Sequence, residues 1–264
     1  MYEFIEAEIQ NDVALITLNR PDKRNALTRA FIGELNQFVE EVKANSNVRL
    51  LVLKAKGSVF CAGMDLSEMK ERANADDPEK EWQHDSEIYN RLVSSLFALP
   101  IPTLAVLQGP VLAGGTGMVF ACDLVIASDK AFVSLPEPKR GIVAAMVAPL
   151  LVYRAGMSTA SWLLFSGKPL AANEALRRGL FHEVVDEDSL ESATTSLINS
   201  ILTGSHSALQ STKTHLKQVA DVDVLRQIGE STEVSAEARR SPDAQEGLAA
   251  FAEKRNPNWQ IEFK

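Results

Sequence analysis

The sequence predicts an α/β fold in which short buried strands alternate with helices, followed by a helical region at the C-terminus. Two observations carry this prediction. Apolar runs rich in branched residues, typical of buried strands, recur between stretches of helical periodicity up to about residue 145. From there the pattern is nearly all helical, with interruptions at 167–169, 181–186 and 241–242. Alternation of this kind is typical of α/β domains.

The N-terminal part of the chain predicts a hairpin, a helix and a buried strand. Residues 3–9 and 12–18 alternate apolar and polar side chains, as a β-hairpin does. Thr28 can cap the helix that follows, which extends to about residue 45. Apolar side chains recur along this helix at helical spacing: Phe31, Leu35, Phe38 and Val42. Residues 48–53 then have the branched, apolar composition of a buried strand.

The middle of the chain predicts three further strands and one long helix. The strands are expected at 103–107, 123–127 and 131–134, which are short and apolar. A helix is expected over 82–98, because two prolines directly after it end the helical pattern. The polar residues 74–81 before it are expected to form a mobile loop.

The bulk properties of the chain limit its class. Its 264 residues, 45% of them hydrophobic, can bury a full core, and we expect a core over 1–200 and a helical region over 201–264. A net charge of −8 argues against a general nucleic-acid binder. Neither a signal peptide nor a membrane span is indicated. With only two cysteines, Cys61 and Cys122, we expect no disulfide framework and a cytoplasmic location.

The segment from Gly109 to Ala144 is the most informative about function. A glycine-dense turn over 109–117 precedes an apolar helical run, and one carboxylate, Glu137, follows beside Pro136. Glycine lets the backbone approach a ligand closely, and free amides at the start of a helix attract anionic oxygen. A lone carboxylate nearby can move protons. The segment therefore predicts an enzyme that stabilises an oxyanion with backbone amides and performs acid–base chemistry with one glutamate.

Several other kinds of site are not indicated. No Gly-Lys-Ser/Thr follows the glycine-rich turn, so the turn is not a P-loop. The four histidines show no metal-binding spacing, and the sequence has no Gly-x-Ser-x-Gly nucleophile elbow. Cys61 is expected to be a small buried residue rather than a nucleophile. Asp65 is expected mainly to cap the helix that follows it.

Short motifs follow one another in order along nearly the whole chain. They are Leu18 to Pro21, Asn25 to Leu27, Phe60 to Leu66, Gly109 to Asp123, Pro136-Glu137, Leu170 to Ala175, Gly179 to Val185 and Phe251 to Arg255. Together they resemble the crotonase superfamily, also called the enoyl-CoA hydratase/isomerase family. The resemblance implies a crotonase-like spiral of ββα turns, an α-helical C-terminal trimerisation region, and a homotrimer or dimer of trimers. It also implies an acyl-CoA thioester substrate, with coenzyme A as part of the substrate and no metal or other cofactor.

The resemblance also implies roles for individual residues. In this family two backbone amides hold the thioester oxygen, and they correspond here to the amides of Met64 and Gly114, with Glu137 as the catalytic carboxylate. The residues expected to contact the substrate are Arg24, Ala26, Ala62, Asp65, Leu66, Pro136 and Lys254. Arg24 and Lys254 are candidates for contacts with the phosphates of CoA, and Lys254 is a candidate for reaching a neighbouring subunit.

The chain departs from the family's hydratases at one position. Hydratases of the family usually carry a second glutamate three residues after the oxyanion-hole glycine, where this chain has Gly117. Glu137 alone suits a one-base proton shuttle, the pattern of the family's Δ3-Δ2-enoyl-CoA isomerases. The alternatives are a hydratase or thioester hydrolase that uses the same site, and a non-catalytic acyl-CoA-binding protein. The hydrolase branch usually has an aspartate where Ala144-Ala145 stand. Lys139 and Arg140 are expected to point away from Glu137, because a nearby cation would lower its pKa.

Overall fold

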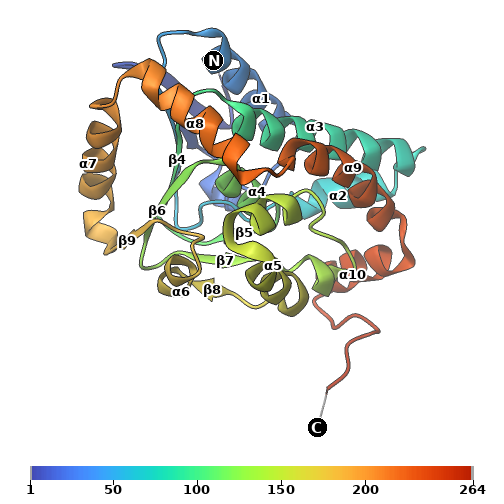
Figure 1. The fold of residues 1–264 in the computed structure, drawn as a ribbon. Helices are drawn as coiled ribbons and strands as arrows, with labels where there is room; N and C mark the ends of the chain where they lie inside the picture. The colour runs from blue at the N-terminus through green and yellow to red at the C-terminus, as the bar shows by residue number, and fades with distance from the viewer. Residues whose placement is uncertain (1, 263–264) are drawn as a thin grey trace.

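The computed structural model describes residues 2–262 and confirms the expected α/β architecture with a helical C-terminal region (Figure 1). Six strands form one sheet in the order β1-β2-β3-β4-β6-β9. They are β1 (Ile5–Gln10), β2 (Val13–Leu18), β3 (Leu50–Ala55), β4 (Thr103–Leu107), β6 (Leu124–Ser128) and β9 (Glu183–Val185). The predicted hairpin is confirmed, since β1 pairs antiparallel with β2, and the other neighbours pair in parallel. A second, three-stranded sheet contains β5 (Val111–Leu112), β7 (Phe132–Ser134) and β8 (Leu170–Ala171).

Ten α-helices surround these sheets in the described part of the chain. They are α1 (Arg29–Ala44), α2 (Leu66–Ala73), α3 (Pro78–Ala98), α4 (Gly114–Ala121), α5 (Ala148–Ser166), α6 (Ala172–Arg177), α7 (Leu190–Leu202), α8 (His206–Ala220), α9 (Val224–Arg240) and α10 (Pro242–Ala252). A 3-10 turn at Glu137–Arg140 lies between β7 and α5 along the chain. No helix within residues 2–262 has both the length and the apolar character needed to cross a membrane.

The two faces of the six-stranded sheet bury different layers. On β3, Leu51 and Leu53 join the main core with α1, α3 and α4, whereas Leu50 and Val52 join a smaller cluster under α7. Successive side chains of a strand point to opposite faces, so an unbroken apolar run is what a strand covered on both sides requires. The branched composition of this segment is explained by that position.

The first residues of α1 and α3 test the helix starts that were predicted from the sequence. Thr28 caps α1 as expected, because its Oγ1 accepts a hydrogen bond from the Phe31 amide at 3.1 Å. The predicted mobile loop over 74–81 is wrong in its second half, since α3 begins at Pro78. Asp77 caps that helix by accepting from the Lys80 amide at 3.1 Å, and proline is favoured in the first turn.

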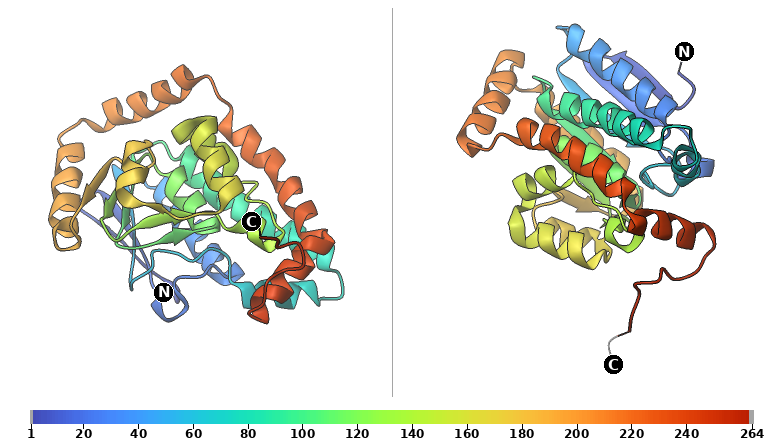
Figure 2. Two further views of the ribbon diagram at one scale, coloured as in Figure 1. Left: turned by 90° about the horizontal axis from the view of Figure 1, so that it is seen from below. Right: turned by 90° about the vertical axis from the view of Figure 1, so that its right-hand side faces the viewer.

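The C-terminal helices pack onto the core along much of their length. Helix α9 lies beside α3 (Figure 2), where the Asn90 side chain donates to the Ile228 carbonyl at 3.2 Å. Helix α10 lies against the 137–140 turn so closely that a Cβ on Gly247 would overlap the Arg140 carbonyl. The expected division between 1–200 and 201–264 falls inside α7, and it stays a prediction.

Candidate active site

One wall of the site is an extended segment that passes between Leu27 and β5. The Leu27 amide donates to the Gly63 carbonyl at 2.8 Å, and the Asp65 amide donates to the Leu27 carbonyl at 2.9 Å. Because these two bonds use the groups on either side of Met64, the Met64 N–H is turned to the opposite side, where α4 begins. The Leu112 amide donates to the Cys61 carbonyl at 2.9 Å and joins the segment to β5.

The side chain of Asn25 anchors the chain next to this segment through hydrogen bonds. Its side-chain amide donates to the carbonyls of Lys56, Val59 and Phe60 at 2.9, 2.9 and 3.0 Å, and its Oδ1 accepts from the Arg20 amide at 2.8 Å. Asn25 is fully buried and has a left-handed φ of 51°, which asparagine tolerates better than most residues. This motif residue therefore anchors the turn and does not face the cavity.

The other wall is the start of α4. Ala113 precedes the helix with φ 49° and ψ −130°, a strained conformation for a residue with a Cβ. The Ala113 amide donates to the Ser134 carbonyl at 2.9 Å, which ties the turn to β7. Gly114 is the first residue of α4, so its N–H has no partner within the helix.

The two walls touch, and their free amides face the same cavity. A Cβ on Gly63 would lie 3.3 Å from the Gly114 nitrogen and 2.6 Å from the Ala113 Cβ. Across residues 2–262, the N–H groups of Met64 and Gly114 have no hydrogen-bond acceptor. Two free backbone donors where the two walls meet, one of them at a helix N-terminus, are suited to stabilise a negatively charged oxygen.

Glu137 is the carboxylate of this site. It follows Pro136 at the end of β7 and is only 6% exposed, and its Oε2 has no hydrogen-bond partner among the described residues. Burial raises the pKa of Glu137 from 4.5 to about 7, while the nearby Arg140 guanidinium lowers it to a smaller extent. A carboxyl group that titrates near neutral pH can both accept and return a proton.

A cavity of about 50 Å³ brings Met64, Gly114 and Glu137 together. Most of its other walls are apolar side chains: Leu66, Met69, Ile142, Val143, Ala144, Ala145, Met146 and Val147. Its remaining polar neighbours are Tyr89, Arg140, Ser235 and Arg239. The cavity is therefore suited to the reacting part of an apolar acyl group next to two hydrogen-bond donors and one base.

The remaining candidate residues divide into two groups. Leu66 lines the cavity with the three catalytic candidates. The others do not line it: Arg24, Ala26, Ala62, Asp65, Pro136 and Lys254. Asp65 has the expected capping role, since its Oδ1 accepts from the Ser67 amide at 3.0 Å, and its Oδ2 lies 2.7 Å from Arg20. Arg24 and Lys254 are both exposed, and their contacts with CoA stay a prediction.

The expectation that both cations after Glu137 point away is wrong for Arg140. Lys139 does point away, because its Nζ donates to the Gly167 carbonyl at 2.9 Å. Arg140 instead lines the cavity and stacks on the Phe251 ring of α10 at 4.6 Å. This position depends on a helix far along the chain, so no local sequence pattern indicates it.

Two further cavity residues were not found from the sequence. Tyr89 comes from α3 and Arg239 from α9, and neither belongs to a motif. The Arg239 side chain donates to the Ser86 hydroxyl at 3.2 Å and lies over the Trp82 ring. Helical spacing indicates only that such residues face inwards, so their place in the site follows from tertiary packing.

Nucleophilic cysteine chemistry does not fit this site. Burial raises the pKa of Cys61 to about 12, so its thiol stays protonated at neutral pH and is a poor nucleophile. Cys122 is also a free, buried thiol. No group of three or more His, Cys, Asp or Glu side chains that could hold a metal ion occurs within residues 2–262.

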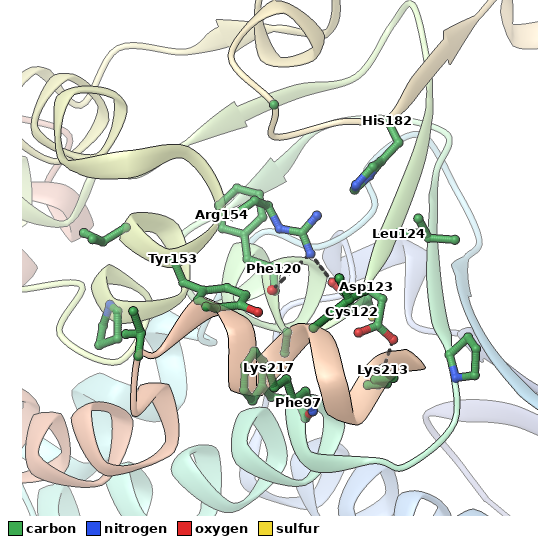
Figure 3. Close-up of a pocket in the computed structure, with 18 of the residues that line it drawn as sticks. Phe97, Phe120, Cys122, Asp123, Leu124, Tyr153, Arg154, His182, Lys213 and Lys217 are labelled. Atoms are coloured by element: carbon green, nitrogen blue, oxygen red, sulfur yellow. Dashed lines mark hydrogen bonds and ion pairs between the residues drawn. The ribbon is translucent and has the colours of Figure 1, made fainter. Parts of the chain in front are cut away.

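A larger hollow of about 840 Å³ lies between α8 and the ends of α4 and β6 (Figure 3). Its charged groups are already engaged. Lys213 lies 2.7 Å from Asp123 and donates to the Ile101 carbonyl at 2.8 Å. Arg154 donates to the carbonyls of Phe120 and Cys122. These contacts fix α5 and α8 on the core, so the smaller cavity with the unpartnered carboxylate is the candidate active site.

Comparison with known proteins identifies the family. The sequence profile of the enoyl-CoA hydratase/isomerase family matches residues 8–262. A short-chain-enoyl-CoA hydratase of Clostridium acetobutylicum is 30% identical over 250 residues, which cover 94% of each chain. The human mitochondrial enoyl-CoA hydratase domain-containing protein 3 is 30% identical over 249 residues, 94% of this chain and 80% of that one.

Solved structures agree with the sequence relatives. The crystal structure of an enoyl-CoA hydratase/isomerase from Xanthobacter autotrophicus superposes with a TM-score of 0.87 at 27% identity, covering 99% of this chain and 100% of that chain. A structure of an enoyl-CoA hydratase from Mycobacterium avium subsp. paratuberculosis superposes with a TM-score of 0.86 at 26% identity. The chain therefore has the crotonase fold and belongs to the enoyl-CoA hydratase/isomerase family.

Proposed function

We propose that the protein is an enoyl-CoA isomerase that shifts a double bond from Δ3 to Δ2 in an acyl-CoA thioester. The observation that carries this proposal is the single carboxylate of the cavity. Glu137 is buried, has a pKa of about 7, and lies in one cavity with the free amides of Met64 and Gly114. Moving a proton between two carbons needs one base and a stabilised enolate, and these three groups supply both.

The proposed reaction follows from the places of these groups. The thioester oxygen accepts hydrogen bonds from the Met64 and Gly114 amides, which makes the protons on C2 more acidic. Glu137 removes one C2 proton, and the resulting dienolate carries its negative charge largely on the thioester oxygen. Glu137 then returns the proton to C4, which leaves the double bond between C2 and C3. Each donor contributes about 2.7–4 kcal/mol of stabilisation to a transition state of this kind.

Hydration is the main alternative, because the relatives described above are named hydratases. Addition of water needs a base for the water and an acid for the carbon, and Gly117 has no side chain to act as the second group. Thioester hydrolysis is a further alternative, although Ala144 and Ala145 supply no acid next to the cavity. A non-catalytic acyl-CoA-binding role would not require an unpartnered, buried Glu137, which costs stability.

Isotope labelling distinguishes these reactions in one experiment. The purified protein is incubated with a 3-enoyl-CoA and, separately, with a 2-enoyl-CoA in oxygen-18 water, and the products are analysed by mass spectrometry. We expect unlabelled 2-enoyl-CoA from the 3-enoyl ester. Labelled 3-hydroxyacyl-CoA would identify a hydratase and labelled free acid a hydrolase, and either would contradict the isomerase. Binding without any product would support the non-catalytic role.

The pH dependence of the reaction should report Glu137 directly. The carboxylate must be deprotonated to accept the C2 proton, and its pKa is about 7 rather than 4.5. We therefore expect kcat/KM for the 3-enoyl ester to rise about tenfold per pH unit below pH 7 and to level off above it. The profile is measured with the free enzyme at subsaturating substrate. An inflection near pH 4.5 would contradict the assignment of Glu137 as the buried base.

The family resemblance extends the proposal to assembly, and the low cysteine count extends it to location. We propose a homotrimer or dimer of trimers in the cytoplasm that uses CoA as part of its substrate and no other cofactor. Leu216 and Val219 on α8 support subunit contacts, because 61% and 67% of their surfaces are exposed although both are apolar. The mass of the particle in solution, measured by light scattering, tests this, and a monomer at micromolar concentration would contradict it.

A further inference from the structure

Tyr89 takes up the space beside Gly117. A Cβ added to Gly117 would overlap the Tyr89 hydroxyl oxygen and would lie 3.2 Å from the Tyr89 Cζ and 3.3 Å from a methyl group of Val147. Tyr89 itself is only 4% exposed within α3, so it has little freedom to move aside. A side chain at position 117 and the hydroxyl of Tyr89 therefore exclude each other.

The same hydroxyl is bonded to the turn that carries one of the two free amides. The Tyr89 Oη donates to the Gly114 carbonyl at 2.5 Å. On the other side of Gly114, the Ala113 amide donates to the Ser134 carbonyl at 2.9 Å. The Gly114 N–H thus lies between two fixed groups, in a glycine that would otherwise be free to change conformation.

The chemistry of the phenol limits what it can do at this place. Burial raises the pKa of Tyr89 well above its ordinary value, and the nearby Glu137 carboxylate raises it further. Tyr89 therefore stays protonated, and its one proton is donated to the Gly114 carbonyl. It can neither activate a water molecule as a base nor deliver that proton as a second acid without giving up the bond to Gly114.

We propose that Tyr89 is the residue that restricts this site to one-base chemistry, by filling the position of a second acid and by holding the Gly114 amide towards the thioester oxygen. The catalytic part of the proposal, the restriction to one-base chemistry and the positioning of the Gly114 amide, rests on the proposed isomerase function. Its steric part concerns only the pair of Tyr89 and Gly117. Tyr89 is a positioning residue here, since it acts on the substrate through Gly114.

The steric part is tested without any reaction. Gly117→Ala should lower the thermal midpoint of the full-length protein strongly when Tyr89 is present. In Tyr89→Phe the hydroxyl is gone, and a small shift relieves the remaining 3.2 Å approach. We expect the two substitutions to couple by about tenfold or more in the unfolding equilibrium constant. Additive effects in this double-mutant cycle would overturn the steric part.

The catalytic part is tested by adding the second acid. Gly117→Glu combined with Tyr89→Phe should form labelled 3-hydroxyacyl-CoA from 2-enoyl-CoA in oxygen-18 water, whereas Gly117→Glu alone should not. Equal hydration by both variants would overturn the proposal. So would the absence of labelled product from the double variant when its thermal midpoint and its isomerisation rate match those of Tyr89→Phe alone. If the wild-type protein already hydrates 2-enoyl-CoA, the proposed function fails, while the double-mutant cycle still decides the steric part.

Tyr89→Phe by itself tests the positioning role. We expect kcat for isomerisation to fall about 10²-fold with little change in KM, because a poorly held amide affects the transition state more than binding. Tyr2→Phe is the matched control, since it removes another phenol hydroxyl with a hydrogen bond of 2.8 Å, to Glu41 on the surface. An unchanged kcat in Tyr89→Phe, or an equal loss in Tyr2→Phe, would overturn the positioning role.

Discussion

Replacing Glu137 with glutamine should lower kcat for isomerisation about 10⁴-fold while the affinity for a CoA ester stays nearly the same. Glutamine has the same shape but cannot accept the C2 proton. In the one-base mechanism the same carboxylate both removes that proton and returns it to C4, so both steps are lost. The binding groups of Met64 and Gly114 are backbone amides and are not touched by the change. Turnover is measured with a 3-enoyl-CoA and binding by calorimetry with a saturated acyl-CoA.

The same variant should be more stable than the wild type at alkaline pH. Because burial raises the pKa of Glu137 from 4.5 to about 7, the folded protein binds this proton more tightly than the unfolded chain. Stability therefore falls as the pH rises from about 4.5 to 7, and the cost, about 3 kcal/mol, is fully present above pH 7. Glutamine removes this cost, so Glu137→Gln should raise the thermal midpoint at pH 8 and change it little at pH 4.5.

A matched control separates the base from the general loss of a charge. Glu8→Gln removes an exposed carboxylate on β1, far from the cavity walls, and should change neither kcat nor the thermal midpoint. Retention of more than a tenth of the wild-type kcat in Glu137→Gln would contradict its role as the base. A lower thermal midpoint at pH 8 would contradict the buried, unpartnered state of the carboxylate.

Local signals in the sequence predicted the parts of the site that depend on backbone geometry. The glycine-rich turn does open a helix at Gly114, Thr28 and Asp65 do cap their helices, and Glu137 does follow β7. Caps, tight turns and buried strands are determined by a few neighbouring residues, so they can be inferred without tertiary structure. The start of α3 at Pro78 had such a signal as well, in the Asp77-Pro78 pair that supplies its N-cap and its first residue.

The site residues that the sequence did not predict are positioned by packing between elements that lie far apart in the chain. Tyr89 meets Gly114 only because α3 lies against α4, and Arg140 lines the cavity because α10 holds its guanidinium over Phe251. The sequence marks Gly117 as lacking the family's usual glutamate, but it does not indicate what fills the space. A side chain from another helix does so, and helical periodicity says nothing about which helices become neighbours.

Gly63 should be the glycine of the site whose loss is most harmful. It has a φ of +87°, a conformation that side chains rarely adopt. Its added Cβ would lie 2.6 Å from the Ala113 Cβ, 3.2 Å from the Leu112 carbonyl oxygen and 3.3 Å from the Gly114 nitrogen. Gly63→Ala must therefore push the turn before α4 away from the segment that carries Met64.

The consequence is a separation of the two amides that face the thioester oxygen. We expect kcat/KM of Gly63→Ala to fall about 10²-fold or more, because losing one such donor costs about 2.7–4 kcal/mol in the transition state. Stability should fall too, by about 1–3 kcal/mol for the strained backbone. Gly33→Ala is the matched control, since nothing lies within 4 Å of its added Cβ on α1, and alanine there should be neutral or slightly stabilising. If Gly63→Ala folds with wild-type activity, the contact between the two turns does not set the position of the amides, and the oxyanion site must be placed elsewhere in the cavity.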